Sequence, residues 1–152
     1  MMLQYKIKST PKGLTAYKQG ITQFFKVFKA STIIIFNNKN ETILHLKNTS
    51  LLGSNYEIVD FNISYFKELP FMIQVHNAIK LSQEDLISLS YNFFSLTTHT
   101  LKYNENKIGS IKPRFFSFTR DLTVNFTTNN KSLIDISLIL LLIKFTISEI
   151  EN

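Results

Sequence analysis

Cations and aromatic rings are mixed most densely in one segment near the start of the last third of the chain. It reads Lys112-Pro-Arg-Phe-Phe-Ser-Phe-Thr-Arg120, so three cations and three phenylalanines fall within it. Cations bind phosphate, and flat rings stack on a base or contact a ribose, so this mixture is typical of RNA contact. The segment has neither helical nor strand periodicity. The alternative interpretation is a loop whose phenylalanines fill the edge of the core, and the sequence leaves both open.

The whole chain is basic. Its 152 residues contain 17 lysines and arginines against 11 aspartates and glutamates, which gives a net charge of +6 at pH 7. Such an excess favours a polyanionic partner such as nucleic acid. The sequence is also rich in the residues that AT-rich codons specify, so part of this charge can reflect genome composition. The candidate RNA-binding residues are Lys39, Lys80, Arg114, Arg120 and Lys131.

Catalytic and metal-binding patterns do not accompany these cations. There is no cysteine, and His45, His76 and His99 have no ligand spacing. Phosphate-cradling glycine loops and nucleophile motifs are absent from the sequence. We therefore expect a binding protein and not an enzyme, with no metal, no cofactor and no small-molecule substrate.

The first two thirds of the chain predict two helices between short strands. Apolar residues recur at helical spacing over 14–30, and Ser82 followed by Glu84 and Asp85 is typical of a helix start, predicting a helix over 82–95. The predicted strand segments are 32–36, 42–46, 56–65, 71–75, 99–103 and 107–111.

The last third has the clearest pattern. Apolar and polar residues alternate over 122–126, which predicts a half-buried strand. Ser132 is the expected cap of a final helix that ends near Phe145. The unbroken apolar stretch Leu138–Ile143 is far shorter than the roughly 20 residues that span a bilayer, so we expect a core helix and no membrane insertion.

These elements predict one domain over residues 1–152 of the α+β class. The expected architecture is a single antiparallel sheet with helices packed on one face. The other face would then remain for a partner.

The order of elements resembles the large-subunit ribosomal protein five family, the bacterial and organellar type that associates with 5S rRNA. The resemblance is carried by Arg120-Asp-Leu-Thr-Val-Asn-Phe-Thr-Thr-Asn-Asn-Lys-Ser132 with the Leu-rich helix after it, and by Pro70-Phe-Met-Ile-Gln-Val75 followed by Ile79-Lys80. The family's glycine-rich stretch after the first strand has no counterpart here. Contact with 5S rRNA is therefore left open.

The resemblance implies a structural constituent of the large ribosomal subunit that binds rRNA in the central protuberance. Its partners would be rRNA, neighbouring ribosomal proteins, P-site tRNA and a small-subunit protein across an intersubunit bridge. The hairpin with Tyr65 and Lys67 would lie near the tRNA. The AT-rich composition and an N-terminus without the features of a presequence indicate a mitochondrion or another organelle. The alternative function is an accessory structural subunit of an organellar membrane complex, with the final helix docking on a membrane partner.

Overall fold

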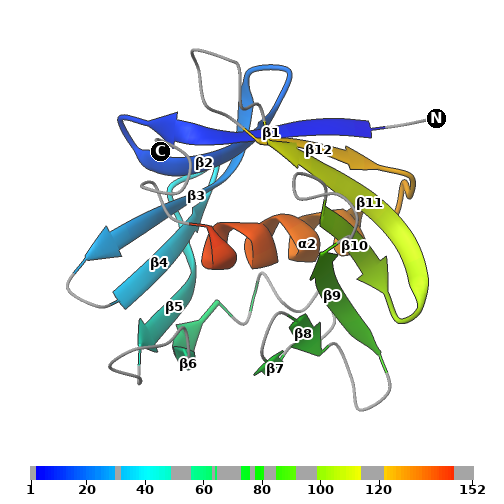
Figure 1. Cartoon of the computed structure of the whole chain (residues 1–152). Helices are drawn as coiled ribbons and strands as arrows, with labels where there is room; N and C mark the ends of the chain where they lie inside the picture. The colour runs from blue at the N-terminus through cyan, green and yellow to red at the C-terminus, as the bar shows by residue number, and fades with distance from the viewer. Residues whose placement is uncertain are drawn as a thin grey trace.

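The computed structural model describes residues 3–29, 32–48, 56–62, 64, 73–75, 78–80, 85–91, 99–113 and 122–145. In this part of the chain, twelve strands form one sheet, and a helix follows the last strand (Figure 1). The strands are β1 (Leu3–Thr10), β2 (Gly13–Lys18), β3 (Ile21–Lys29), β4 (Thr32–Asn37), β5 (Thr42–Asn48), β6 (Tyr56–Phe61), β7 (Ile73–Val75), β8 (Ala78–Lys80), β9 (Leu86–Tyr91), β10 (His99–Tyr103), β11 (Asn106–Pro113) and β12 (Leu122–Phe126). The helix is α2 (Lys131–Lys144).

Two meanders of six strands are joined at the centre of the sheet. The spatial order is β6-β5-β4-β3-β2-β1-β12-β11-β10-β9-β8-β7, and all neighbours are antiparallel. The central pair is the first strand with the last, in a register from Leu3 opposite Phe126 to Ile7 opposite Leu122. The rings of Tyr5 and Phe126 form a T-shaped contact across the same pair, with centroids 5.5 Å apart and planes at 87°. This pairing makes the two halves one continuous sheet.

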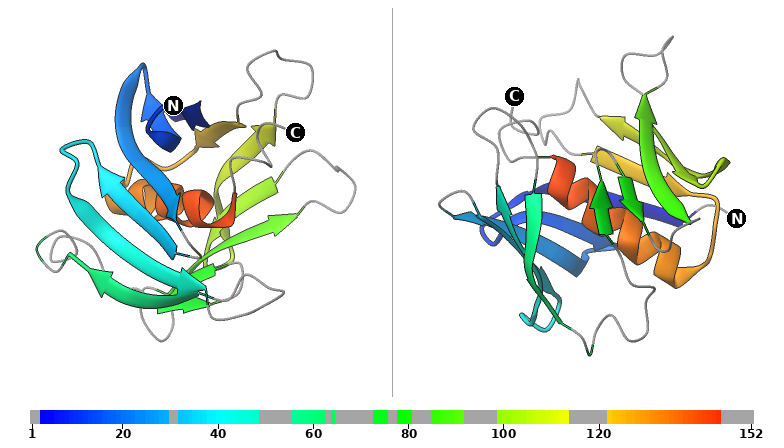
Figure 2. Two further views of the ribbon diagram at one scale, coloured as in Figure 1. Left: turned by 90° about the vertical axis from the view of Figure 1, so that its left-hand side faces the viewer. Right: turned by 90° about the horizontal axis from the view of Figure 1, so that it is seen from below.

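The sheet curves around α2, which runs through its concave side (Figures 1 and 2). Every helix residue from Ile134 to Ile143 is buried, because strand side chains cover the helix on several sides. A helix that is apolar all round is stable in water only in such surroundings. The inward residues of the strands, Ile7, Leu14, Ile35, Leu101 and Val124 among them, complete a single core with it.

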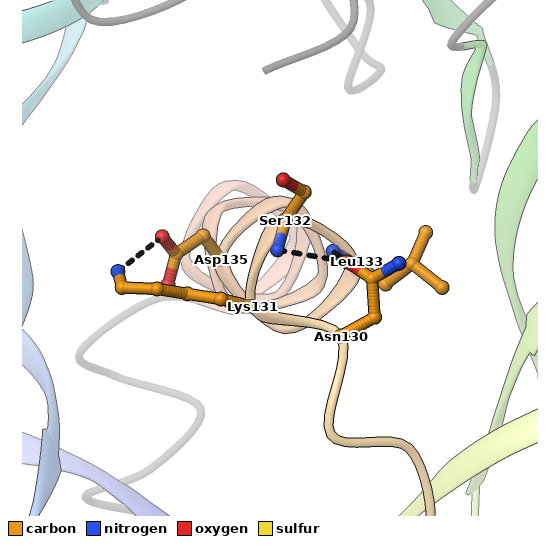
Figure 3. Close-up of polar contacts among 5 residues, drawn as sticks. All are labelled: Asn130, Lys131, Ser132, Leu133 and Asp135. Atoms are coloured by element: carbon orange, nitrogen blue, oxygen red, sulfur yellow. Dashed lines mark hydrogen bonds and ion pairs between the residues drawn. The ribbon is translucent and has the colours of Figure 1, made fainter. Parts of the chain in front are cut away.

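Both ends of α2 have polar partners. Asn130 is the N-cap, and its Oδ1 accepts from the backbone N–H groups of Ser132 and Leu133 at 3.1 and 3.3 Å (Figure 3). At the other end, the buried Lys26 ammonium of β3 donates to the carbonyl of Phe145, the C-cap residue. A cation there complements the negative end of the helix dipole. The predicted strand 122–126 and final helix are confirmed, but the cap is Asn130 and not Ser132.

The predicted helix over 14–30 is wrong, since β2 and β3 form a hairpin there. Gln19 and Gly20 occupy the two-residue turn with φ of 51° and 81°, the left-handed pair that a tight hairpin turn requires. A bulge at Ala16/Tyr17 and the inward-facing Lys26 disturb the two-residue alternation. As a result, the apolar residues over 14–30 have a spacing close to that of a helix although they lie on two strands.

The predicted helix over 82–95 is also wrong in its described part, which is strand β9. Leu86 begins this strand, and its N–H donates to Oδ1 of Asn104 in the β10–β11 turn at 2.9 Å. The α+β class with helices on one face is therefore corrected to a nearly all-β fold that encloses one helix in the described residues. Strands were expected at 32–36, 42–46, 99–103 and 107–111, and β4, β5, β10 and β11 confirm them.

Gly13 provides a test of this hairpin packing. Its φ is +128°, and a Cβ built there would lie 2.3 Å from the Lys26 carbonyl oxygen, whereas a Cβ at Gly20 meets nothing within 4 Å. We expect Gly13→Ala to lower the free energy of unfolding by about 2–4 kcal/mol, and Gly20→Ala by only about 1 kcal/mol for its left-handed backbone. Urea denaturation followed by circular dichroism measures both. Equal losses in the two variants would contradict the register of β2 against β3.

Candidate nucleic-acid interface

The convex side of the sheet carries a row of polar and basic side chains across its centre. On β1, Tyr5 and Ile7 are buried toward the helix, so the alternating Lys6 and Lys8 point outward. The register places Lys6 between Tyr17 of β2 and Thr123 of β12. Thr123 in turn faces Lys112 of β11. Lys6 and Lys112, two strands apart with β12 between them, thus share one surface.

Aromatic rings accompany these lysines in the neighbouring row. Lys8 faces Thr15, Thr15 faces Phe25, and Phe25 faces Phe36 across strands β1 to β4. The rings of Phe25 and Phe36 stack with centroids 4.9 Å apart and planes 16° from parallel. We call this surface the outer basic face; its residues are Lys6, Lys8, Lys12, Tyr17, Phe25, Phe36 and Lys112.

Two of the four lysines of the outer basic face, Lys8 and Lys12, lie over its rings. Lys8 Nζ lies 5.2 Å from the centroid of Tyr17, and Lys12 Nζ lies 5.5 Å from that of Phe25. At these distances a cation is attracted to the ring face. The arrangement holds the ammonium groups close to the sheet. Phe25 is buried beneath Lys12, whereas Tyr17 is half-buried and keeps exposed surface beside Lys8.

The strands beneath this face contain no acidic residue. Among the described strands, aspartate and glutamate occur on β6 alone, as Glu57 and Asp60. The charged side chains that the described strands place at the centre of the sheet are therefore all cations, and cations attract polyanions. Lysines that neutralise phosphates, beside rings that accept unstacked bases, form the usual surface for single-stranded nucleic acid.

The predicted RNA-binding residues do not lie on this face where the structure describes them. Lys39 is exposed in the β4–β5 turn, and Lys131 is exposed in the first turn of α2. Lys80 belongs to β8, but its side chain is outside the described part. Arg114 and Arg120 lie outside the described residues, as do Tyr65 and Lys67 of the expected tRNA-proximal hairpin.

Lys39 and Lys131 nevertheless meet at one place, a polar cavity of about 340 Å³ at the rim of the sheet where α2 begins. We call it the rim pocket. Side chains from β3, the β4–β5 turn, the segment after β6 and the first turns of α2 line it, with Asn38, Lys39, Glu41, Asn62, Lys131 and Asp135 among them. The fold thus brings together two predicted residues that are far apart in the sequence.

The wall of the rim pocket contains a buried carboxylate. Lys131 Nζ lies 3.0 Å from Oδ2 of Asp135, one helical turn further along α2 (Figure 3). The Asp135 side chain is 9% exposed and that of Lys131 is 84% exposed, so the lysine approaches from solvent. Burial and, secondarily, the Asp135 charge raise the pKa of the nearby Tyr5 phenol, while the Lys131 charge lowers it.

Metal binding has no support in the described part of the chain, where no three histidine, aspartate or glutamate side chains come together. His45 of β5 faces Asp60 of β6 across the strands, far in sequence from His99 on β10. Burial lowers the pKa of His99, which favours its neutral form. His45 and His99 are therefore strand residues of the sheet, and they do not lie together as metal ligands would.

The final helix cannot serve as the docking surface of the alternative function in this fold. Its residues from Ile134 to Ile143 are buried inside the curved sheet. Within the described residues, no helix has the length and apolar character needed to cross a membrane.

Sequence reasoning missed the outer basic face because it placed Tyr17, Phe25 and their neighbours on a helix. The useful signal was the pair Gln19-Gly20, which marks a hairpin turn between two strands. Once that turn is recognised, Lys6, Lys8 and Tyr17 fall on one side of neighbouring strands.

Comparison with known proteins gave no match: no family model, no curated protein and no solved structure is similar to this chain at a significant level.

The Tyr5 phenol reports on the charges at the rim pocket. We expect Asp135→Asn to lower the pKa of Tyr5, because the raising charge is removed while that of Lys131 stays. Lys131→Gln should raise it. NMR titration with ring-labelled tyrosine measures both, and Tyr103, whose pKa is raised by burial and by Asp85, is the internal control. Shifts of Tyr5 in the same direction in both variants would contradict this arrangement.

Proposed function

We propose that this chain is a structural RNA-binding protein of a ribonucleoprotein particle and that it binds RNA through the outer basic face. The observation that carries the proposal is the set of lysines over aromatic rings on strands that contain no acidic residue. Lysines neutralise phosphates, and the half-buried rings of Tyr17 and Phe36 add stacking that tolerates any base. Nothing in this mode requires catalysis.

The particle we propose is the large ribosomal subunit of an organelle, with the mitochondrion first. Support comes from the sequence resemblance at the last strand and final helix, which are β12 and α2 in the fold. The segments predicted as helices over 14–30 and 82–95 are strands β2, β3 and β9 where the structure describes them, so they lend the resemblance no support. We therefore assign rRNA contact to the outer basic face of this chain.

Loss of lysines from the outer basic face should change the salt dependence of RNA binding. For Lys6→Gln with Lys112→Gln, we expect weaker binding of a single-stranded RNA and a slope of log K against log salt that is shallower by about 1.4, or about 0.7 for each lost phosphate contact. Fluorescence anisotropy of a labelled RNA measures the slope. The titrations are done between about 50 and 300 mM salt, where the affinity changes strongly with salt. The matched control is Lys47→Gln with Lys107→Gln, two exposed lysines on β5 and at the start of β11. An equal change in both double variants would contradict an RNA surface at the centre of the sheet.

Membership in a ribosomal particle has a separate test. In a sucrose gradient of native lysate, we expect the chain to sediment with the large subunit and to leave that fraction after RNase treatment. Mass spectrometry of the fractions follows it. Sedimentation with membranes, unchanged by RNase, would reject the particle and favour the membrane-complex alternative.

A further inference from the structure

The rim pocket differs from the outer basic face in its electrostatics. Its walls hold two cations, Lys39 and Lys131, and two carboxylates, Glu41 and Asp135, so its formal charge is balanced. Lys131 is already engaged with Asp135. A balanced pocket has no preference for a phosphate, which the acid-free outer face attracts more strongly.

The amide side chains of the rim pocket supply the groups that nucleobases require. Gln23, Asn38 and Asn62 line it, and an amide side chain carries both N–H donors and an acceptor oxygen. Gln23 Nε2 also donates to the backbone carbonyl of Ile21 at 3.2 Å, and Asn62 is engaged within the fold as well. The edges of an unpaired base present the same mixture of donors and acceptors, and single-stranded RNA is read on those edges. Phe24 adds an apolar part to the wall.

The β4–β5 turn, which carries Asn38 and Lys39, is held in shape before any ligand binds. Asn37 Oδ1 accepts from the backbone N–H groups of Lys39 and Glu41, both at 3.0 Å, and its Nδ2 donates to Glu41 Oε1 at 3.2 Å. The Asn37 side chain is thereby a scaffold, and Asn38 and Lys39 project from a fixed turn. A site fixed in this way loses little conformational entropy on binding.

The rim pocket is also adjacent to the outer basic face. Phe24 and Asn37 in its wall are the chain neighbours of Phe25 and Phe36, whose stacked rings lie on the convex side. Because successive side chains of a strand point to opposite faces, Phe24 and Asn37 face away from the side that carries those rings. An RNA strand that crosses the rings must therefore pass over the rim to reach the pocket. At about 340 Å³ the cavity is near the lower end of the range of small-ligand pockets, about 300–1,000 Å³, which suits a single nucleoside.

We infer that the rim pocket binds the unstacked base and ribose of one nucleotide and gives the protein a base preference. This inference rests on the proposed function where the nucleotide belongs to bound RNA. A free nucleoside offers the same chemistry, so the experiment has one arm for each source.

In the first arm, ten-nucleotide homopolymers of A, C and U are titrated against the protein and followed by fluorescence anisotropy. We expect the wild type to prefer one of them by about tenfold, the effect of about one net hydrogen bond, and Asn38→Ala with Lys39→Ala to remove that preference. The control is Asn106→Ala with Lys107→Ala, an exposed Asn-Lys pair at the β10–β11 turn with the same change of composition and charge. It should retain the preference.

In the second arm, adenosine, cytidine and uridine are titrated into the wild type and followed by the backbone NMR signals of Asn38 and Lys39. Saturable shifts at these residues with one nucleoside support the pocket, even if no RNA binds and the proposed function fails. RNA binding without base preference, or a preference that the pocket and control variants lose equally, overturns the inference while leaving the proposed function intact. Absence of both nucleoside shifts and base preference overturns it as well.

Discussion

The burial of α2 is the constraint on which the rest of the molecule depends. Ten consecutive residues of this helix, from Ile134 to Ile143, are buried, so no face of it is left for water. A flat sheet can cover one side of a helix only, and the remaining apolar surface would cost about 25 cal/mol for each Å² exposed. The strands must therefore curve around the helix. Their inward residues pack against the helix, so only the convex side and the rim of the sheet remain for contacts with a partner.

The same constraint explains the buried lysine of β3. The last carbonyl groups of a helix have no partner within it, and such groups are costly when they are withdrawn from water and left unpaired. Lys26 supplies a donor to Phe145 from a strand position where an apolar residue would otherwise be expected. At the opposite end, Asn130 accepts from two N–H groups of the first turn. One residue from a distant strand and one from the helix's own cap thus supply partners at the two ends of the enclosed helix.

Elements whose pattern is local were predictable from the sequence, and those that depend on distant partners were not. Strand 122–126 alternates cleanly, and the final helix follows a polar turn, so both were predicted. The segment 14–30 was misassigned because Lys26 faces inward, where it donates to the carbonyl of Phe145. These two residues are 119 positions apart in the chain, so the sequence pattern of the segment does not reveal the contact. The site follows the same rule. Lys39 and Lys131 were chosen singly as cations, but their meeting at the rim pocket depends on where α2 begins inside the sheet.

The outer basic face and the rim pocket differ in what they contribute to the proposed binding: the first gives affinity and the second gives selectivity. On the outer basic face, lysines act through counterion release, which is strong, depends on salt and carries no sequence information. In the rim pocket, opposite charges lie side by side, so long-range attraction is weak and short-range hydrogen bonds decide what fits. Asp135 matters for this division, because it is 9% exposed and paired with Lys131. Without its charge, the first turn of α2 would add an exposed cation to the positive end of a helix, and the pocket would attract phosphate in place of a base. The pairing of Lys131 with Asp135 therefore keeps the pocket neutral beside a surface that is not.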